Sequence, residues 1–168
     1  MTDKDSGSAP RRGARGMNDL ADQPATPWAA SRSLKAKTAV QRNVTALFDE
    51  LAPEKALTRA EPLKNRIEEH RTPSGCVLQA SNAALSLSWF ADSDSAGELH
   101  VVAWRGTVSR RGVPVPRENA VAMQEMVLFP IEAPADDKLW RTAQGTRYDT
   151  ASLARQCLAL LEEQIGAP

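Results

Sequence analysis

Few residues in this chain could do chemistry, and their spacing matches no common type of active site. Asp92 and Asp94 begin a stretch that superficially resembles the start of a calcium-binding loop. The twelfth position of that loop would be Ala103, which cannot provide the bidentate carboxylate that such a site needs. The stretch also separates two predicted strands rather than two helices, so we interpret it as a hairpin loop.

The histidines and hydroxyl side chains indicate no catalytic motif either. His70 and His100 have no cysteine or histidine at the spacing of a zinc site. The chain has no Gly-x-Ser-x-Gly nucleophile elbow, no Walker loop and no Rossmann glycine run. We therefore predict a non-catalytic protein without metal or cofactor, although residues far apart in the sequence could still assemble a catalytic triad in space.

An arginine cluster is the most distinctive charge feature. It follows Trp104 in a stretch that has no carboxylate before Glu118, and it consists of Arg105, Arg110, Arg111 and Arg117. Such a basic arm could contact an acidic protein surface, or it could contact phosphates while the tryptophan stacks on a base. Nucleic-acid binding is the less favoured interpretation, because Lys plus Arg and Asp plus Glu number 21 each and a dedicated DNA-binding domain usually carries a positive excess.

The chain divides into a tail and one domain. Residues 1–32 are rich in Arg, Gly, Ser and Pro and offer little to bury, so we predict a disordered tail. Trp28 is the exception there, and it either packs the end of the tail against the domain or forms a short motif that docks on a partner. Residues 33–168 are long enough to bury a core without disulfides, so Cys76 and Cys157 are predicted to be buried and unpaired.

Helical periodicity predicts one amphipathic helix near each end of the domain. The first helix starts at an N-cap, Ser33, and ends at Pro53, and its apolar stripe is Val40, Val44, Leu47, Phe48 and Leu51. The last helix starts at Asp149 or Thr150 and ends at Gly166. A weaker helix is predicted over residues 62–70, and residues 72–75 then form a turn that interrupts regular structure.

Between these helices the sequence predicts an antiparallel sheet of three to five strands. Residues 85–89 alternate apolar and polar side chains, and residues 99–108 form the returning strand. Residues 121–131 form a third strand, although residues 117–126 would also suit a helix. Short strands near residues 140 and 147 add a last hairpin. Because the strands follow one another without βαβ alternation, the fold class is α+β, with both helices packed on one face of the sheet.

The other face of the sheet carries the functional prediction. In the strand that begins at Leu99, the side chains His100, Val102 and Trp104 share one face, so that face is also largely apolar. A sheet with one solvated face alternates more cleanly, so we expect something to cover this face. The chain's own loops, a second copy, a partner protein or a ligand could do so.

The favoured hypothesis is a non-catalytic protein-interaction module, such as an adaptor, a chaperone-like protein, an assembly subunit or a homodimer. The predicted contact residues are Trp28, Trp104, Arg105, Arg110 and Arg111. One alternative is a small-molecule-binding domain or enzyme whose pocket is lined by Trp89, Trp104 or Trp140. Another is a nucleic-acid-binding regulator that uses the arginine cluster. Since the N-terminus has no apolar secretory segment and no apolar run could span a bilayer, a cytoplasmic location is predicted.

Overall fold

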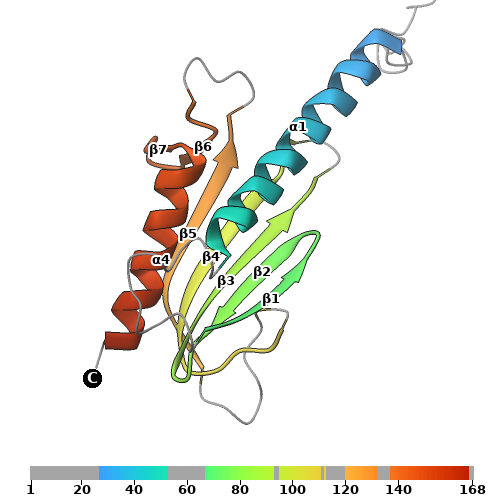
Figure 1. Ribbon diagram of the computed structural model, residues 1–168. Coiled ribbons are helices and arrows are strands. Elements are labelled where there is room, and N and C mark those ends of the chain that lie inside the picture. The colour runs from blue at the N-terminus through green and yellow to red at the C-terminus, as the bar shows by residue number, and fades with distance from the viewer. Residues whose placement is uncertain are drawn as a thin grey trace, which may run out of the picture.

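The structure is a computed structural model that describes residues 27–52, 67–92, 95–110, 112, 120–131 and 137–166, with residues 27–33 described by their backbone. Within these ranges the chain forms two helices and seven strands (Figure 1). They are α1 (Pro27–Leu51), β1 (Glu68–Thr72), β2 (Gly75–Gln79), β3 (Ala83–Phe90), β4 (Glu98–Arg105), β5 (Val121–Pro130), β6 (Trp140–Thr142), β7 (Arg147–Tyr148) and α4 (Thr150–Gly166). The α+β class is confirmed, but the sheet has seven strands where three to five were predicted.

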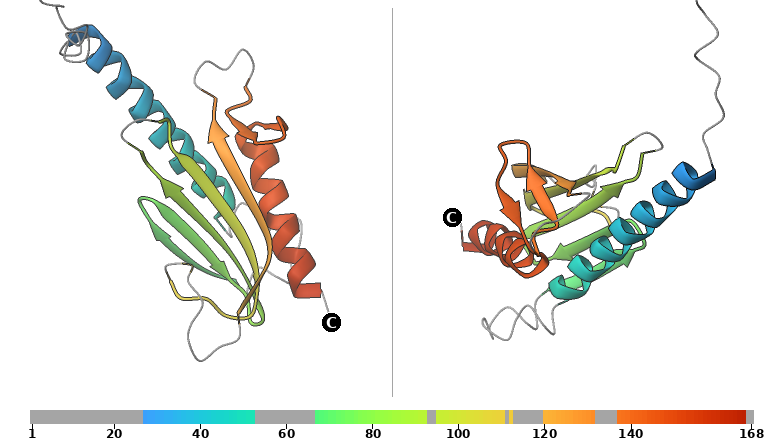
Figure 2. Two further views of the ribbon diagram at one scale, coloured as in Figure 1. Left: turned by 180° about the vertical axis from the view of Figure 1, so that it is seen from behind. Right: turned by 90° about the horizontal axis from the view of Figure 1, so that it is seen from above.

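The sheet is a meander in which every strand pairs with its neighbours in the sequence. The strand order is β1-β2-β3-β4-β5-β6-β7, and all pairs are antiparallel. Both helices lie on the same side of the sheet, and α1 contacts α4 (Figure 2). The two helices therefore cover one face of the sheet, and neither of them lies on the opposite face (Figure 2).

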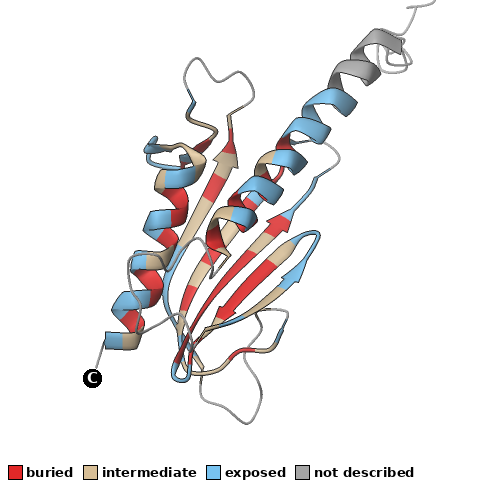
Figure 3. Cartoon of the chain, in the orientation of Figure 1, coloured by how far each residue is buried: buried red, intermediate tan, exposed pale blue. Residues whose placement is uncertain are grey.

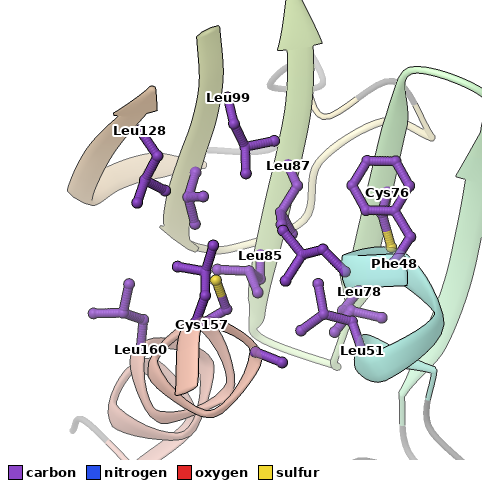
Figure 4. Close-up of a cluster of buried hydrophobic side chains, with 14 of the residues drawn as sticks. Phe48, Leu51, Cys76, Leu78, Leu85, Leu87, Leu99, Leu128, Cys157 and Leu160 are labelled. Atoms are coloured by element: carbon purple, nitrogen blue, oxygen red, sulfur yellow. The ribbon is translucent and has the colours of Figure 1, made fainter. Parts of the chain in front are cut away.

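The core lies between the helices and the sheet. Phe48 and Leu51 of α1 lie over β2, where Leu78 is buried, and Cys157 of α4 lies beside Leu85 of β3 (Figure 4). Residues of β3 alternate strictly between the core and the opposite face, because successive side chains of a strand point to opposite sides. A fully buried leucine contributes about 1.5–3 kcal/mol through the hydrophobic effect, so this two-layer core supplies most of the stability.

Helix α1 extends further toward the N-terminus than predicted. It begins at Pro27 rather than after Ser33, and proline suits the first turn because its missing N–H has no partner there in any case. Its described side chains before Val40, residues 34–39, are all exposed, so within residues 34–51 the buried side chains of α1 begin at Val40 (Figure 3). The predicted placement of the helices is therefore correct only in part. Residues 1–26 of the predicted tail lie outside the described residues.

The weak helix predicted over residues 62–70 is wrong at its C-terminal end. Residues 62–66 lie outside the described residues, but residues 68–70 belong to β1, an edge strand of charged and polar side chains. Arg71 of β1 ties this strand to α1: its guanidinium donates to the Thr45 carbonyl at 3.1 Å and lies 2.8 Å from the Asp49 carboxylate. Contacts with α1 thus stabilise residues 68–70 as a strand, although their local sequence pattern predicts a helix.

The end of the chain folds as predicted. Strands β6 and β7 form the short hairpin, and residues 121–126 are strand rather than helix, while residues 117–119 lie outside the described residues. Asp149 caps α4 by accepting a hydrogen bond from the Ser152 N–H at 2.7 Å. This bond stabilises the carboxylate and lowers the pKa of Asp149 below its ordinary value.

Among the described residues, neither helix is long and apolar enough to cross a bilayer.

Candidate interaction surface

The face of the sheet opposite the helices, called here the second face, contains the candidate site. Strand register assigns to it alternate residues of the four central strands. They are Gly75, Val77 and Gln79 of β2, Ala84, Ser86, Ser88 and Phe90 of β3, Glu98, His100, Val102 and Trp104 of β4, and Glu125, Val127 and Phe129 of β5. This is the face that the apolar character of β4 marked in the sequence.

One end of the second face is covered by the chain itself. After β4 the chain turns back over the sheet, and Val108 is buried against Val77 and Ala84. The Val108 N–H donates to the Gln79 side-chain oxygen at 3.1 Å, and the Gln79 amide nitrogen donates to the Ala83 carbonyl at 3.0 Å. We call residues 106–110 and 112 the covering loop, since they shield this part of the sheet.

Gly112 brings the covering loop into direct contact with β3. Its φ is +72°, in the left-handed region that favours glycine. A Cβ at this position would lie 2.7 Å from the Ser86 Cβ, which is closer than two non-bonded carbon atoms pack in proteins. Only glycine therefore allows the backbone of the loop to lie this close to the sheet.

The rest of the second face is an open strip of partly exposed apolar and aromatic side chains. The open strip consists of Phe90, His100, Val102, Val127 and Phe129. Phe90 is 55% exposed and meets the edge of the His100 ring at a centroid distance of 4.8 Å. The guanidinium of Arg141 lies 5.7 Å from the centre of the Phe129 ring. Self-coverage by the covering loop is thus real but incomplete.

A hollow of about 640 Å³ is formed by the second face and the covering loop. Trp104, Arg110 and Gly112 line it together with the serines of β3 and with His100 and Val102 of the open strip. The Trp104 indole N–H donates to the Ser86 hydroxyl at 2.9 Å, so the polar group of the half-buried ring already has a partner. The hollow thus combines an aromatic wall, several hydroxyl groups and one guanidinium.

Charged groups occupy different parts of this surface. The Glu98 carboxylate lies 2.9 Å from His100 Nε2, and the Glu125 carboxylate lies 3.8 Å from His100 Nδ1. Arg110 is exposed on the covering loop and makes no ion pair within the described ranges. The two carboxylates therefore lie close to His100, whereas the guanidinium of Arg110 lies on the covering loop.

The described residues show no assembled catalytic group. Ser88 lies opposite His100 in the strand register, but no hydrogen bond joins the two side chains there. Burial raises the pKa of both Cys76 and Cys157 to about 12, so their thiols are protonated at neutral pH. In the described part of the chain, no three His, Cys, Asp or Glu side chains are placed to hold a metal ion.

The structure brings together two of the five predicted contact residues. Trp104 and Arg110 both line the hollow, whereas Arg105 is exposed at the end of β4 outside it. The side chain of Trp28 and all of Arg111 lie outside the described residues. Of the other tryptophans proposed for a pocket, Trp89 also lines the hollow, whereas Trp140 is fully buried in the core, where it contacts Trp89.

Two aromatic residues of the open strip, Phe90 and Phe129, are not among the five contact residues predicted from the sequence. Phe90 lies on the second face because it pairs with Glu98 of β4. Leu128 of β5 pairs with Leu99, which points into the core, so the next residue, Phe129, points to the second face. Strand register is a tertiary property, and alternation within one strand does not reveal which residues of two other strands lie beside it. Comparison with protein-family models, with curated proteins and with solved structures finds no match to this chain.

Proposed function

We propose that this protein is a non-catalytic interaction module that binds a partner protein through the open strip and the covering loop. The observation that carries the proposal is the open strip itself, because aromatic and aliphatic side chains remain partly exposed after the covering loop has packed on the same face. Contiguous apolar side chains on a protein surface are typical of interaction sites.

The residues around the hollow are of the types that dominate binding energy in protein interfaces. Tryptophan and arginine are enriched among such residues, and here Trp104 and Arg110 line the same hollow. Phe90 is 55% exposed, so a partner that buried the rest of its side chain would gain about half of the roughly 1.5–3 kcal/mol that complete burial provides. A partner that covers the open strip would therefore gain most of its binding free energy from the side chains that are now most exposed, such as Phe90.

The proposal is tested with a pair of matched surface variants. Phe90 and Leu34 are both large, apolar and more than half exposed, but Leu34 lies on α1, on the helix side of the sheet. We expect Phe90→Asp to abolish binding of the partner that the tagged full chain captures from a nuclease-treated lysate of its host, or to abolish self-association. Leu34→Asp should leave both unchanged. If Phe90→Asp retained every interaction of the wild type, the second face would not be the binding surface.

A second candidate function is the binding of a small molecule in the hollow. Its volume of about 640 Å³ falls within the range of small-molecule pockets, and Trp104 provides a flat apolar wall. Such a ligand would change the tryptophan fluorescence, and Trp104→Phe would remove the part of the change that comes from Trp104, since Trp89 also lines the hollow. A metabolite panel that never alters the tryptophan emission would count against this function.

A further inference from the structure

Strand β1 lies at the edge of the sheet, and among the described residues it pairs only with β2. An edge strand presents N–H and C=O groups to which a further strand can bind. The turn between β1 and β2 shows which residues present them. The Trp89 N–H donates to the Ser74 carbonyl at 2.7 Å, so this carbonyl points to β3, and the next residue, Gly75, turns its N–H and C=O toward β1.

Two residues of β1 turn their backbone groups away from the sheet. Gly75 pairs with Thr72, so the N–H and C=O of Thr72 point to β2. The direction of these groups alternates along an antiparallel strand, and those of Glu69 and Arg71 therefore point outward. Pro73, which follows β1, has no N–H and cannot extend the row of donors. The outer edge of β1 thus offers the donors and acceptors of residues 69 and 71.

The side chains of the same two residues carry opposite charges. Glu69 and Arg71 pair with Leu78 and Cys76, which are buried beneath α1, so both charged side chains lie on the helix side of the sheet (Figure 4). The guanidinium of Arg71 already makes two contacts with α1. Its remaining N–H donors can bind a further carboxylate.

A second β1 that runs in the opposite direction matches both patterns. With a two-fold axis at His70, Glu69 of each copy lies opposite Arg71 of the other, and their outward backbone groups face each other. Each opposite-charge contact then forms twice. A pair centred on Glu69 or on Arg71 would instead place like charges together. A strand that matches this edge must read Glu-x-Arg in its own direction, and β1 itself does.

The helices leave room for this arrangement. Phe48 and Leu51 of α1 lie over β2 (Figure 4), and β2 would be three strand spacings from its copy, about 14 Å at roughly 4.8 Å each. Packed helices need only about 8–10 Å between their axes. Toward its N-terminus α1 passes the turn of the hairpin, where the Gln41 side chain donates to the Pro73 carbonyl at 3.1 Å. The two-fold axis places the two turns at opposite ends of the paired strands.

We propose that two copies of this chain pair through β1 about a two-fold axis at His70, so that one antiparallel sheet runs through both copies. Charged side chains on an edge strand usually oppose such pairing, but here the reversed copy turns them into cross-strand ion pairs. The proposal goes beyond the proposed function, because it uses the edge of the sheet and leaves the second face of each copy free for a partner protein.

Two charge reversals at adjacent positions of the full chain test the pairing by sedimentation equilibrium. The wild type should approach twice the monomer mass as its concentration rises. Glu69→Arg should weaken dimerisation at least about tenfold, because arginines then face each other in both symmetric contacts. Glu68→Arg is the matched control: it makes the same change of charge on the other side of the sheet, where Thr72 of the second copy lies opposite. It should leave the dimer intact.

Hydrogen exchange followed by NMR tests the backbone pairing itself. The N–H groups of Glu69 and Arg71 should be protected in the wild-type dimer and should exchange rapidly when the protein is diluted to the monomer. In Glu69→Arg, both positions should exchange rapidly at all concentrations. The His70 N–H points to β2, so its protection in every sample would show that β1 is still folded.

The outcomes separate this proposal from the proposed function. A wild type that stays monomeric, or a dimer that Glu69→Arg does not weaken, would overturn the pairing through β1. A dimer that is lost in Phe90→Asp but kept in Glu69→Arg would also overturn it, because self-association would then use the open strip. A dimer that depends on Glu69, in a protein whose other interactions all survive Phe90→Asp, would support the pairing and overturn the proposed function.

Discussion

The substitution Gly112→Ala should destabilise the protein because two costs act at one position. A left-handed φ costs an alanine about 1–2 kcal/mol. The added Cβ would also lie 2.7 Å from the Ser86 Cβ, and Ser86 belongs to a central strand that cannot give way. The covering loop must therefore move and lose the burial of Val108, which contributes about 2 kcal/mol. We expect a total loss of about 3–4 kcal/mol.

Gly145 provides the matched control for this prediction. Its φ of +90° is also left-handed, but an added Cβ would meet no atom within 4 Å. Gly145→Ala should therefore lose only the conformational cost of about 1–2 kcal/mol. The free energy of unfolding of both variants and the wild type is measured by urea titration with circular dichroism. Equal losses in the two variants would refute the close packing of the covering loop on β3.

Other predictions concern the core thiols and the cap of α4. Cys76 and Cys157 should not react with a thiol reagent at pH 8 until urea unfolds the protein, because burial raises both pKa values to about 12; rapid labelling of the folded protein would contradict this. Asp149→Ala should lower the melting temperature at pH 7. Because the pKa of Asp149 is lowered in the folded state, its stabilisation is present above the unfolded pKa of about 3.9 and is lost as the pH falls through the folded pKa. The difference from the wild type should therefore shrink in melts at low pH, and a constant difference would argue against the cap.

The parts of the fold that were predictable from sequence are those with a strong local signal. Helix α4 has an apolar stripe at helical spacing and an aspartate at its start, and both the element and its cap are confirmed. Strand β4 has apolar residues on both faces, and this property alone indicates that the second face is not an ordinary solvated surface. In both elements, the residues that determine the structure lie next to one another in the sequence.

The parts that were missed depend on contacts between distant segments. Strand β1 is charged and exposed at the edge of the sheet, so its sequence lacks the alternation of a half-buried strand. Strand β2 is a five-residue element buried on both faces, and its short apolar run has no period. The contact of Val108 with Val77 joins residues 31 positions apart in the sequence, and no local pattern indicates that the chain turns back over the sheet there. The sequence therefore indicated that the second face is apolar, but it did not indicate which part of that face the covering loop shields.

The meander topology has a consequence for how this protein folds. Because strand order equals sequence order, each strand can pair with the one just made, and most sheet contacts close short loops. A meander has a lower contact order than a sheet whose neighbouring strands are distant in the sequence, and a lower contact order favours faster folding. The contact of α1 with α4 is different, since it joins the two ends of the described chain. We expect hairpin formation to come early, with the docking of α1 against α4 as the late, entropically costly closure of the domain.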